Sequence, residues 1–134
     1  MLKRAKEFVK KNQDYFYDAF RVLIGLMFAQ HGAQKLFGVF GGVQVASMMS
    51  LFGLAGFIEF FGGLLIAFGL FTRVAAFFGV ADMIGAWYVA HLPKGIVPIQ
   101  NGGELSALYF AAFLVILSQG TGKFGLDKLF KISA

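Results

Sequence analysis

Long apolar runs dominate the chain, and short polar or glycine-rich stretches separate them. The runs extend over about residues 17–38, 51–70, 72–91 and 103–120. A bilayer core about 30 Å thick is crossed by about 20 helical residues at about 1.5 Å each, so each run predicts a transmembrane helix. The sequence therefore predicts an all-α protein, a four-transmembrane-helix bundle that forms a single integral membrane domain over residues 1–134.

The most apolar run, residues 51–70, carries one carboxylate, Glu59, near its middle. On insertion scales an acidic side chain at mid-bilayer costs about 2.5–3.5 kcal/mol, so Glu59 is expected to face a protein partner or a wet cavity. The other runs should supply that partner. In the first run Gly25, Ala29 and Ala33 recur at every fourth position. This spacing of small residues predicts close packing of that helix against a neighbour.

The composition agrees with a membrane protein and excludes an ordinary soluble domain. Hydrophobic residues make up 58% of the chain and aromatic residues 17%. The chain has no cysteine, which excludes disulfides, thiolate metal sites and dithiol redox relays. Any redox chemistry must therefore depend on a cofactor or on a redox partner protein.

The formal net charge of +5 is distributed as a topology signal, and we expect no nucleic-acid partner. Basic residues cluster in residues 1–12, at Arg73 between the second and third runs, and after the fourth run. The positive-inside rule then predicts cytoplasmic N- and C-termini. We expect a multi-pass protein of the plasma (inner) membrane of a prokaryote. Residues 1–12 form a basic juxtamembrane segment that is expected to lie against anionic membrane lipid.

A group of polar residues converges by depth on the outer half of the predicted bundle. Among these, Glu59 and His31 are the candidate catalytic residues. The candidate ligand-binding residues are Lys35, Gln34, His91, Asn101 and Glu104. Several ionisable groups at one bundle mouth are typical of a functional site, although interhelical ion pairs and hydrogen bonds that only fix helix packing are the alternative.

Charge balance and helix geometry predict the partners of these groups. Arg21 and Asp82 are predicted to form a structural ion pair, and Lys35 and His31 to lie nearer Glu104. Asp82 and His91 are nine residues apart and point to opposite sides of a regular helix, which favours a homodimer in which a second subunit completes one face.

Neither metal nor haem is predicted from the histidines. The spacing of His31 and His91 and the neighbouring carboxylates matches no dedicated ligand motif, so we predict no metal site and no intrinsic cofactor. A quinone head group or a small anion is the expected ligand of the pocket, and reduction of a quinone would need protons from a histidine or a buried carboxylate.

Three segments, FAQHGAQKLFG, GLAGFIEFFGGLLIAFGLFTRVAA and QNGGELSALYFAAFLVI, resemble the DoxX family of small four-helix membrane proteins. The resemblance covers residues 21–129 and includes the HGxxK element at His31 and Lys35, the Glu59 to Arg73 segment, and NGGE at residues 101–104. It implies a four-helix bundle with cytoplasmic termini. Members of the family are linked to membrane oxidoreductase complexes, including a thiosulfate:quinone oxidoreductase subunit, and to partners that handle thiols and oxidative stress.

Two functions follow. The first is a redox-linked subunit of a quinone, thiol or sulfur-compound oxidoreductase complex, with a polar pocket in the outer half of the bundle. The second is a non-catalytic membrane scaffold or a small-solute or proton carrier. The cysteine-pair mechanism of vitamin K epoxide reductase-type bundles does not transfer, because this chain has no cysteine.

Overall fold

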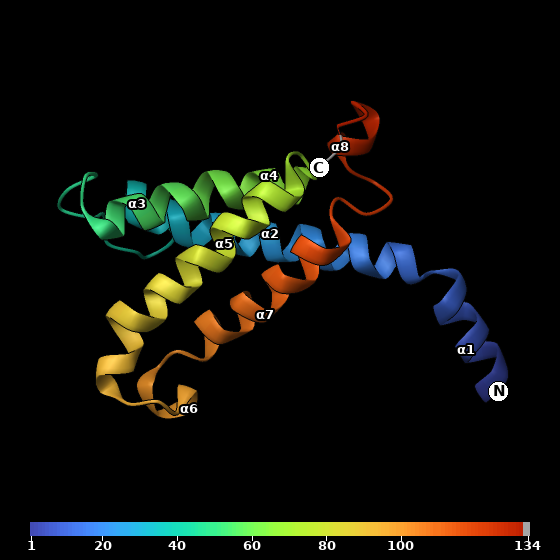
Figure 1. Cartoon of the computed structure of the whole chain (residues 1–134), viewed down its shortest axis with the longest axis horizontal. Helices are drawn as coiled ribbons and strands as arrows, with labels where there is room; N and C mark the ends of the chain where they lie inside the picture. Colours follow the sequence, from blue (N-terminus) through green and yellow to red (C-terminus); the bar gives the residue numbers. More distant parts are fainter. Residues whose placement is uncertain (133–134) are drawn as a thin grey trace.

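The computed structural model describes residues 1–132, and over that range it is all-helical (Figure 1). Short interruptions divide the helical segments, two of which contain a wider π-helical turn and one of which ends in a 3-10 turn. In chain order the elements are α1 (Leu2–Lys11), α2 (Gln13–Phe37), α3 (Leu51–Phe57), η1 (Ile58–Gly62), α4 (Gly63–Phe68), α5 (Thr72–Ala86), η2 (Trp87–His91), η3 (Leu92–Lys94), α6 (Pro98–Asn101), α7 (Glu104–Gln119) and α8 (Leu126–Leu129).

Two continuous helical segments are long and apolar enough to cross a bilayer. They are α3–η1–α4, residues 51–68, and α5–η2–η3, residues 72–94. The other two long helices are not among these candidate spans. Helix α7 is apolar but has only 16 residues, and α2 has 25 residues but is more polar and carries Arg21 and Lys35. The predicted all-helical class is therefore confirmed, whereas four membrane crossings with cytoplasmic termini stay a prediction.

The long helices pack as two pairs, α2 with α3–η1–α4 and α5 with α7 (Figure 1). The first pair is close because glycines line the contact: a Cβ added at Gly25 would lie 2.5 Å from the backbone nitrogen of Ala67 and 2.6 Å from the carbonyl oxygen of Gly63. Both Ala29 and Ala33 are buried. The predicted close approach of the first run is thus confirmed, and its partner is the helix that contains Glu59.

The two helix pairs share an aromatic and aliphatic core. Phe28 of α2 contacts both Tyr109 and Phe113 of α7, with ring centroids 5.3 and 4.6 Å away. Ile66 and Ile116 complete this layer and are fully buried.

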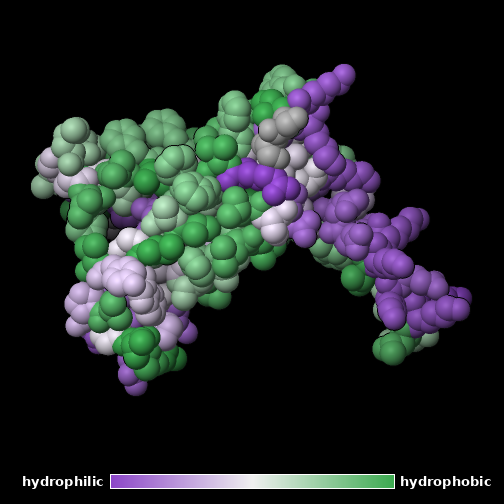
Figure 2. All heavy atoms as spheres, in the orientation of Figure 1, coloured by the Kyte–Doolittle hydropathy of each residue, from purple (hydrophilic) through white to green (hydrophobic). Residues whose placement is uncertain are grey.

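The outer surface of the helices is largely apolar in the view of Figure 2, whereas hydrophilic atoms gather on α1 and on the side of the molecule next to it. Phe61, Phe68, Phe77 and Leu108 expose more than half of their surface. Large aromatic side chains that cover the outside of a helix bundle are typical of contact with lipid.

Candidate functional site

A cavity of about 530 Å³ lies between α3–η1 and α5–η2, with α2 and α7 behind it. Most of its lining is apolar and includes Phe52, Ala55, Gly85 and Val89. The ionisable and polar side chains in its wall are His31, Lys35, Glu59, Asp82, His91, Ser106 and Tyr109. Hydrophilic atoms are visible at depth between the apolar surfaces of these helices (Figure 2). The cavity therefore combines an apolar entrance with a few polar groups, as ligand sites commonly do.

An ion pair between Lys35 of α2 and Glu59 of η1 is the central polar contact of the cavity. Glu59 is only 4% exposed, and its Oε1 accepts the hydrogen bond from Lys35 Nζ. Its other oxygen, Oε2, is buried and has no hydrogen-bond partner within residues 1–132. A buried carboxylate oxygen without a donor is costly in a protein and marks the point where a ligand or water would bind.

Two π-helical turns shape the cavity wall. The first, η1, contains Glu59, and the second, η2, ends at His91. Isolated π-turns in α-helices are rare and occur frequently at functional sites, because the wider turn re-aims a side chain.

The second π-turn explains why one sequence prediction is wrong. Asp82 and His91 were expected on opposite sides of the third run, yet both line the same cavity. Each residue in η2 turns the chain by less than the about 100° of an α-helix, which brings His91 back toward the face of Asp82. The geometric reason for expecting a homodimer is therefore removed.

His91 is fixed from the side of α7. Its ring nitrogens lie 3.1 Å from Ser106 Oγ and 3.3 Å from the carbonyl oxygen of Asn101. Asp82 Oδ2, by contrast, is buried and has no hydrogen-bond partner in the described chain. The two residues thus differ in role: His91 is held in place, and Asp82 has an unused acceptor.

Tyr109 of α7 is the site residue that the sequence reasoning missed. It is 4% exposed, and its hydroxyl is buried without a partner inside the described range. His31 packs edge-on against its ring, with centroids 5.9 Å apart and an interplanar angle of 90°. A lone tyrosine in an apolar run gives no sequence signal that separates a site residue from an ordinary core residue.

Three predicted ligand-binding residues do not line the cavity. Gln34 donates to the carbonyl oxygen of Phe40, 3.1 Å away, and Glu104 is exposed at the start of α7. Asn101 is buried but occupied with its own loop, donating to the carbonyl oxygen of Gly95 and accepting from the amide of Gly103, each at 2.7 Å. The expected proximity of Lys35 to Glu104 is wrong, because Lys35 pairs with Glu59 instead.

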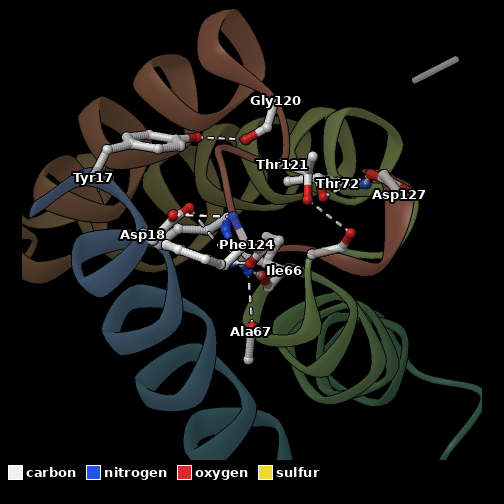
Figure 3. A network of polar contacts seen from close by, with 11 residues as sticks. Tyr17, Asp18, Ile66, Ala67, Thr72, Gly120, Thr121, Phe124 and Asp127 are labelled. Atoms are coloured by element: carbon white, nitrogen blue, oxygen red, sulfur yellow. Dashed lines mark hydrogen bonds and ion pairs between the residues drawn. The ribbon is translucent and has the colours of Figure 1, made fainter. Parts of the chain in front are cut away.

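The predicted Arg21–Asp82 ion pair is also wrong. Arg21 is 1% exposed, lies 3.8 Å from Asp18, and donates to the carbonyl oxygens of Ile66, Ala67 and Phe124 (Figure 3). Two of these carbonyls lie in the last turn of α4, and the third lies in the loop before α8. Carbonyl groups at a helix end and in a loop have no partner within a helix, and Arg21 donates hydrogen bonds to them. Its role is structural, as predicted, but with other partners.

Asp127 of the C-terminal segment joins the same network and was not singled out from the sequence. Its carboxylate accepts from the backbone amides of Phe71 and Thr72 at 2.6 and 3.0 Å and from the Thr72 hydroxyl at 2.8 Å (Figure 3). It therefore caps the N-terminus of α5 from 55 residues away. Two polar clusters thus exist, this packing cluster and the cavity, and each contains buried polar atoms without a partner within residues 1–132.

Comparison with known proteins identifies the family of the chain. The family model described as DoxX matches residues 17–92, which include the π-turns and five of the ionisable cavity residues, His31, Lys35, Glu59, Asp82 and His91. The chain belongs to the DoxX family. An uncharacterised protein of Haemophilus influenzae is 37% identical over 91% of this chain and 96% of its own length. No solved structure matches with significance.

Two further relatives have informative names. A Bacillus subtilis protein named "Putative oxidoreductase CatD" is 28% identical over 80% of this DoxX chain and 81% of its own length. The Escherichia coli inner membrane protein YqjF is 28% identical over 90% and 96%. Together with the apolar outer surface, these relatives identify the chain as a DoxX-family membrane protein.

Proposed function

We propose that this DoxX protein is a redox-linked subunit of a membrane oxidoreductase complex and binds a quinone head group in the cavity between α3–η1 and α5–η2. The observation that carries this proposal is the pairing of an apolar lining with three buried polar atoms that lack a partner in the described chain, Glu59 Oε2, Asp82 Oδ2 and the Tyr109 hydroxyl. A quinone needs an apolar slot for its ring and tail and polar partners for its oxygens.

The proposal includes four crossings of a prokaryotic inner membrane, with both ends of the chain in the cytoplasm. Helix α2 is about 37 Å long at about 1.5 Å per residue, which exceeds a bilayer core of about 30 Å. Helix α7 is about 24 Å long and would rely on a locally thin bilayer. Arg73, Lys123 and Lys128 come from separate segments and line one cavity beside the start of α2, as the positive-inside rule expects of one cytoplasmic end.

The ionisable residues around the cavity supply the proton chemistry. Reduction of a quinone to a quinol takes two electrons and two protons. Glu59, His31 and Asp82 are the groups in the wall that can carry protons at that depth. The electrons would come from a redox partner protein, since the side chains of this cysteine-free chain supply no dithiol.

The test fills the cavity without disturbing the fold. A Cβ added at Gly85 meets no atom within 4 Å, and Gly85 lines the cavity, so Gly85→Leu places a side chain in the binding space. We expect this variant to lose at least tenfold in affinity for a short-chain quinone, measured with the purified protein in detergent. Ala111→Leu, which adds the same bulk on an exposed position of α7, is the matched control and should bind as wild type. Equal binding by wild type and Gly85→Leu would refute the cavity as the quinone site.

A non-catalytic role is the second candidate. The packing cluster around Arg21 and Asp127 favours it, because the buried charges there bond to the backbone of other segments and so hold the helices together. A carrier should conduct protons or small anions in liposomes and lose the flux on Glu59→Gln. A scaffold should be stable, show no flux and bind no quinone.

A further inference from the structure

The unpartnered atoms of the cavity set conditions on the hydrogen bonds that a quinone or quinol would have to make. Glu59 forms an ion pair with Lys35, which bonds only Oε1. The second oxygen, Oε2, can accept hydrogen bonds but cannot donate one. Its ligand must therefore bring a hydrogen-bond donor.

The Tyr109 hydroxyl adds a second condition. It is buried without a partner in the described chain, and it can both donate and accept. A quinone carbonyl can accept from Tyr109 but leaves Glu59 Oε2 without a donor. A quinol hydroxyl can accept from Tyr109 and donate to Glu59 at the same time, so it satisfies both atoms.

The opposite wall carries a further carboxyl group. Asp82 Oδ2 on α5 is another buried atom without a partner in the described chain, and Asp82 lines the same cavity as Glu59. A quinol carries its second hydroxyl at the other end of the ring, where it can donate to a carboxyl oxygen of this wall. A quinone offers no donor at either end.

We infer that the cavity binds the reduced quinol in preference to the quinone, because the free oxygen of the Lys35–Glu59 ion pair, Glu59 Oε2, and the Tyr109 hydroxyl line one cavity without partners. This inference rests on the proposed function and names the oxidation state that the site recognises. A buried polar group left without its partner is the strongest source of such discrimination, since it penalises the ligand that lacks the matching group.

The experiment compares both oxidation states on the full-length protein in detergent under anaerobic conditions. The probes are a short-chain benzoquinone and a short-chain naphthoquinone, each also reduced to its quinol. We expect wild type to bind the quinol at least tenfold more tightly. A tenfold preference also raises the midpoint potential of the bound two-electron couple by about 30 mV relative to the free couple, a readout that needs no variant.

Glu59→Gln is the diagnostic variant. Its amide keeps a carbonyl oxygen for Lys35 and gains an N–H donor for a quinone carbonyl. We expect the preference for quinol to fall below twofold or to reverse, which a merely structural role of Glu59 would not produce. Tyr109→Phe should weaken both forms, and Glu104→Gln, outside the cavity, should change neither.

The possible outcomes distinguish the preference for quinol from the binding of any quinone in the cavity. If quinone binds as tightly as quinol and Gly85→Leu abolishes both, the site stands and the preference is wrong. If neither form binds to wild type, the quinone proposal itself fails. If the preference exists but survives Glu59→Gln at the same size, Glu59 does not cause it and the inference is overturned.

Discussion

Glu59 shows how a buried charge is tolerated at membrane depth. Its Oε1 is neutralised by Lys35 from a neighbouring helix, whereas its Oε2 is left for another group. Removing one partner of a buried ion pair lowers the free energy of unfolding more than replacing both partners by apolar residues. The single substitution leaves one charge uncompensated in a low-dielectric interior. The pair therefore predicts a specific pattern of stability in single and double variants.

We expect Lys35→Met to destabilise the protein by about 3 kcal/mol and the double variant Lys35→Met/Glu59→Leu to recover most of that loss. The measurement is unfolding by denaturant in detergent. Lys94→Met removes an equally basic residue at an exposed position and should change the free energy of unfolding by less than about 0.5 kcal/mol. A double variant as unstable as the single one would show that the ion pair is not the source of the effect.

At the scale of elements, glycine decides how closely α2 approaches the helix that contains Glu59. A Cβ at Gly32 would lie 2.6 Å from the Cα of Phe60 and 2.7 Å from the carbonyl oxygen of Gly56. These are backbone atoms, so no side-chain rotation can make room. The short distance that lets Lys35 reach Glu59 therefore depends on the absence of a side chain one turn earlier.

We predict that Gly32→Ala lowers stability by about 1–3 kcal/mol, the usual cost of overpacking. Gly62→Ala is the matched control, since a Cβ there meets no atom within 4 Å and alanine favours helix more than glycine. Thermal unfolding in detergent should show a lower midpoint for Gly32→Ala only. Equal midpoints for the two variants would contradict the backbone contact.

The cap on α5 is a second prediction at this scale. The residue before α5, Phe71, provides no side-chain cap, and Asp127 supplies the acceptors instead. Asp127→Ala should cost about 1–3 kcal/mol, because it leaves buried donors unsatisfied. Hydrogen exchange should accelerate at the amides of Phe71 and Thr72.

Asp14→Ala serves as the control for the cap, because it removes an exposed carboxylate near the same end of the bundle. Unchanged exchange at Thr72 in Asp127→Ala would mean that the cap contributes nothing to the start of α5.

At the scale of the whole molecule, the distribution of charged residues predicts how the protein is oriented in the membrane. Hydrophilic surface gathers on α1 and on the side of the molecule next to it, while the other helices expose aromatic side chains (Figure 2). The absence of native cysteine makes the orientation directly testable, because any introduced cysteine is the only thiol.

Single cysteines at Lys6, Lys94 and Lys128 test the predicted four crossings. In intact cells a membrane-impermeant maleimide should label Lys94→Cys only, and Lys6→Cys and Lys128→Cys should react after the membrane is opened. Labelling of Lys6→Cys and Lys128→Cys on opposite sides would require an odd number of crossings and would refute the proposed topology.

The sequence by itself determined the helical class, the close packing of the first run, and the need of Glu59 for a partner, because these follow from local hydropathy, residue size and the cost of a charge in lipid. Only the tertiary structure decided which groups meet. The π-turn that brings His91 to the side of Asp82, the pairing of Lys35 with Glu59 rather than Glu104, and the reach of Asp127 to α5 all depend on helix rotation and on chain segments far apart in sequence. A residue pattern fixes the face of a regular helix, but it does not encode where the helix widens or which distant backbone amides need an acceptor.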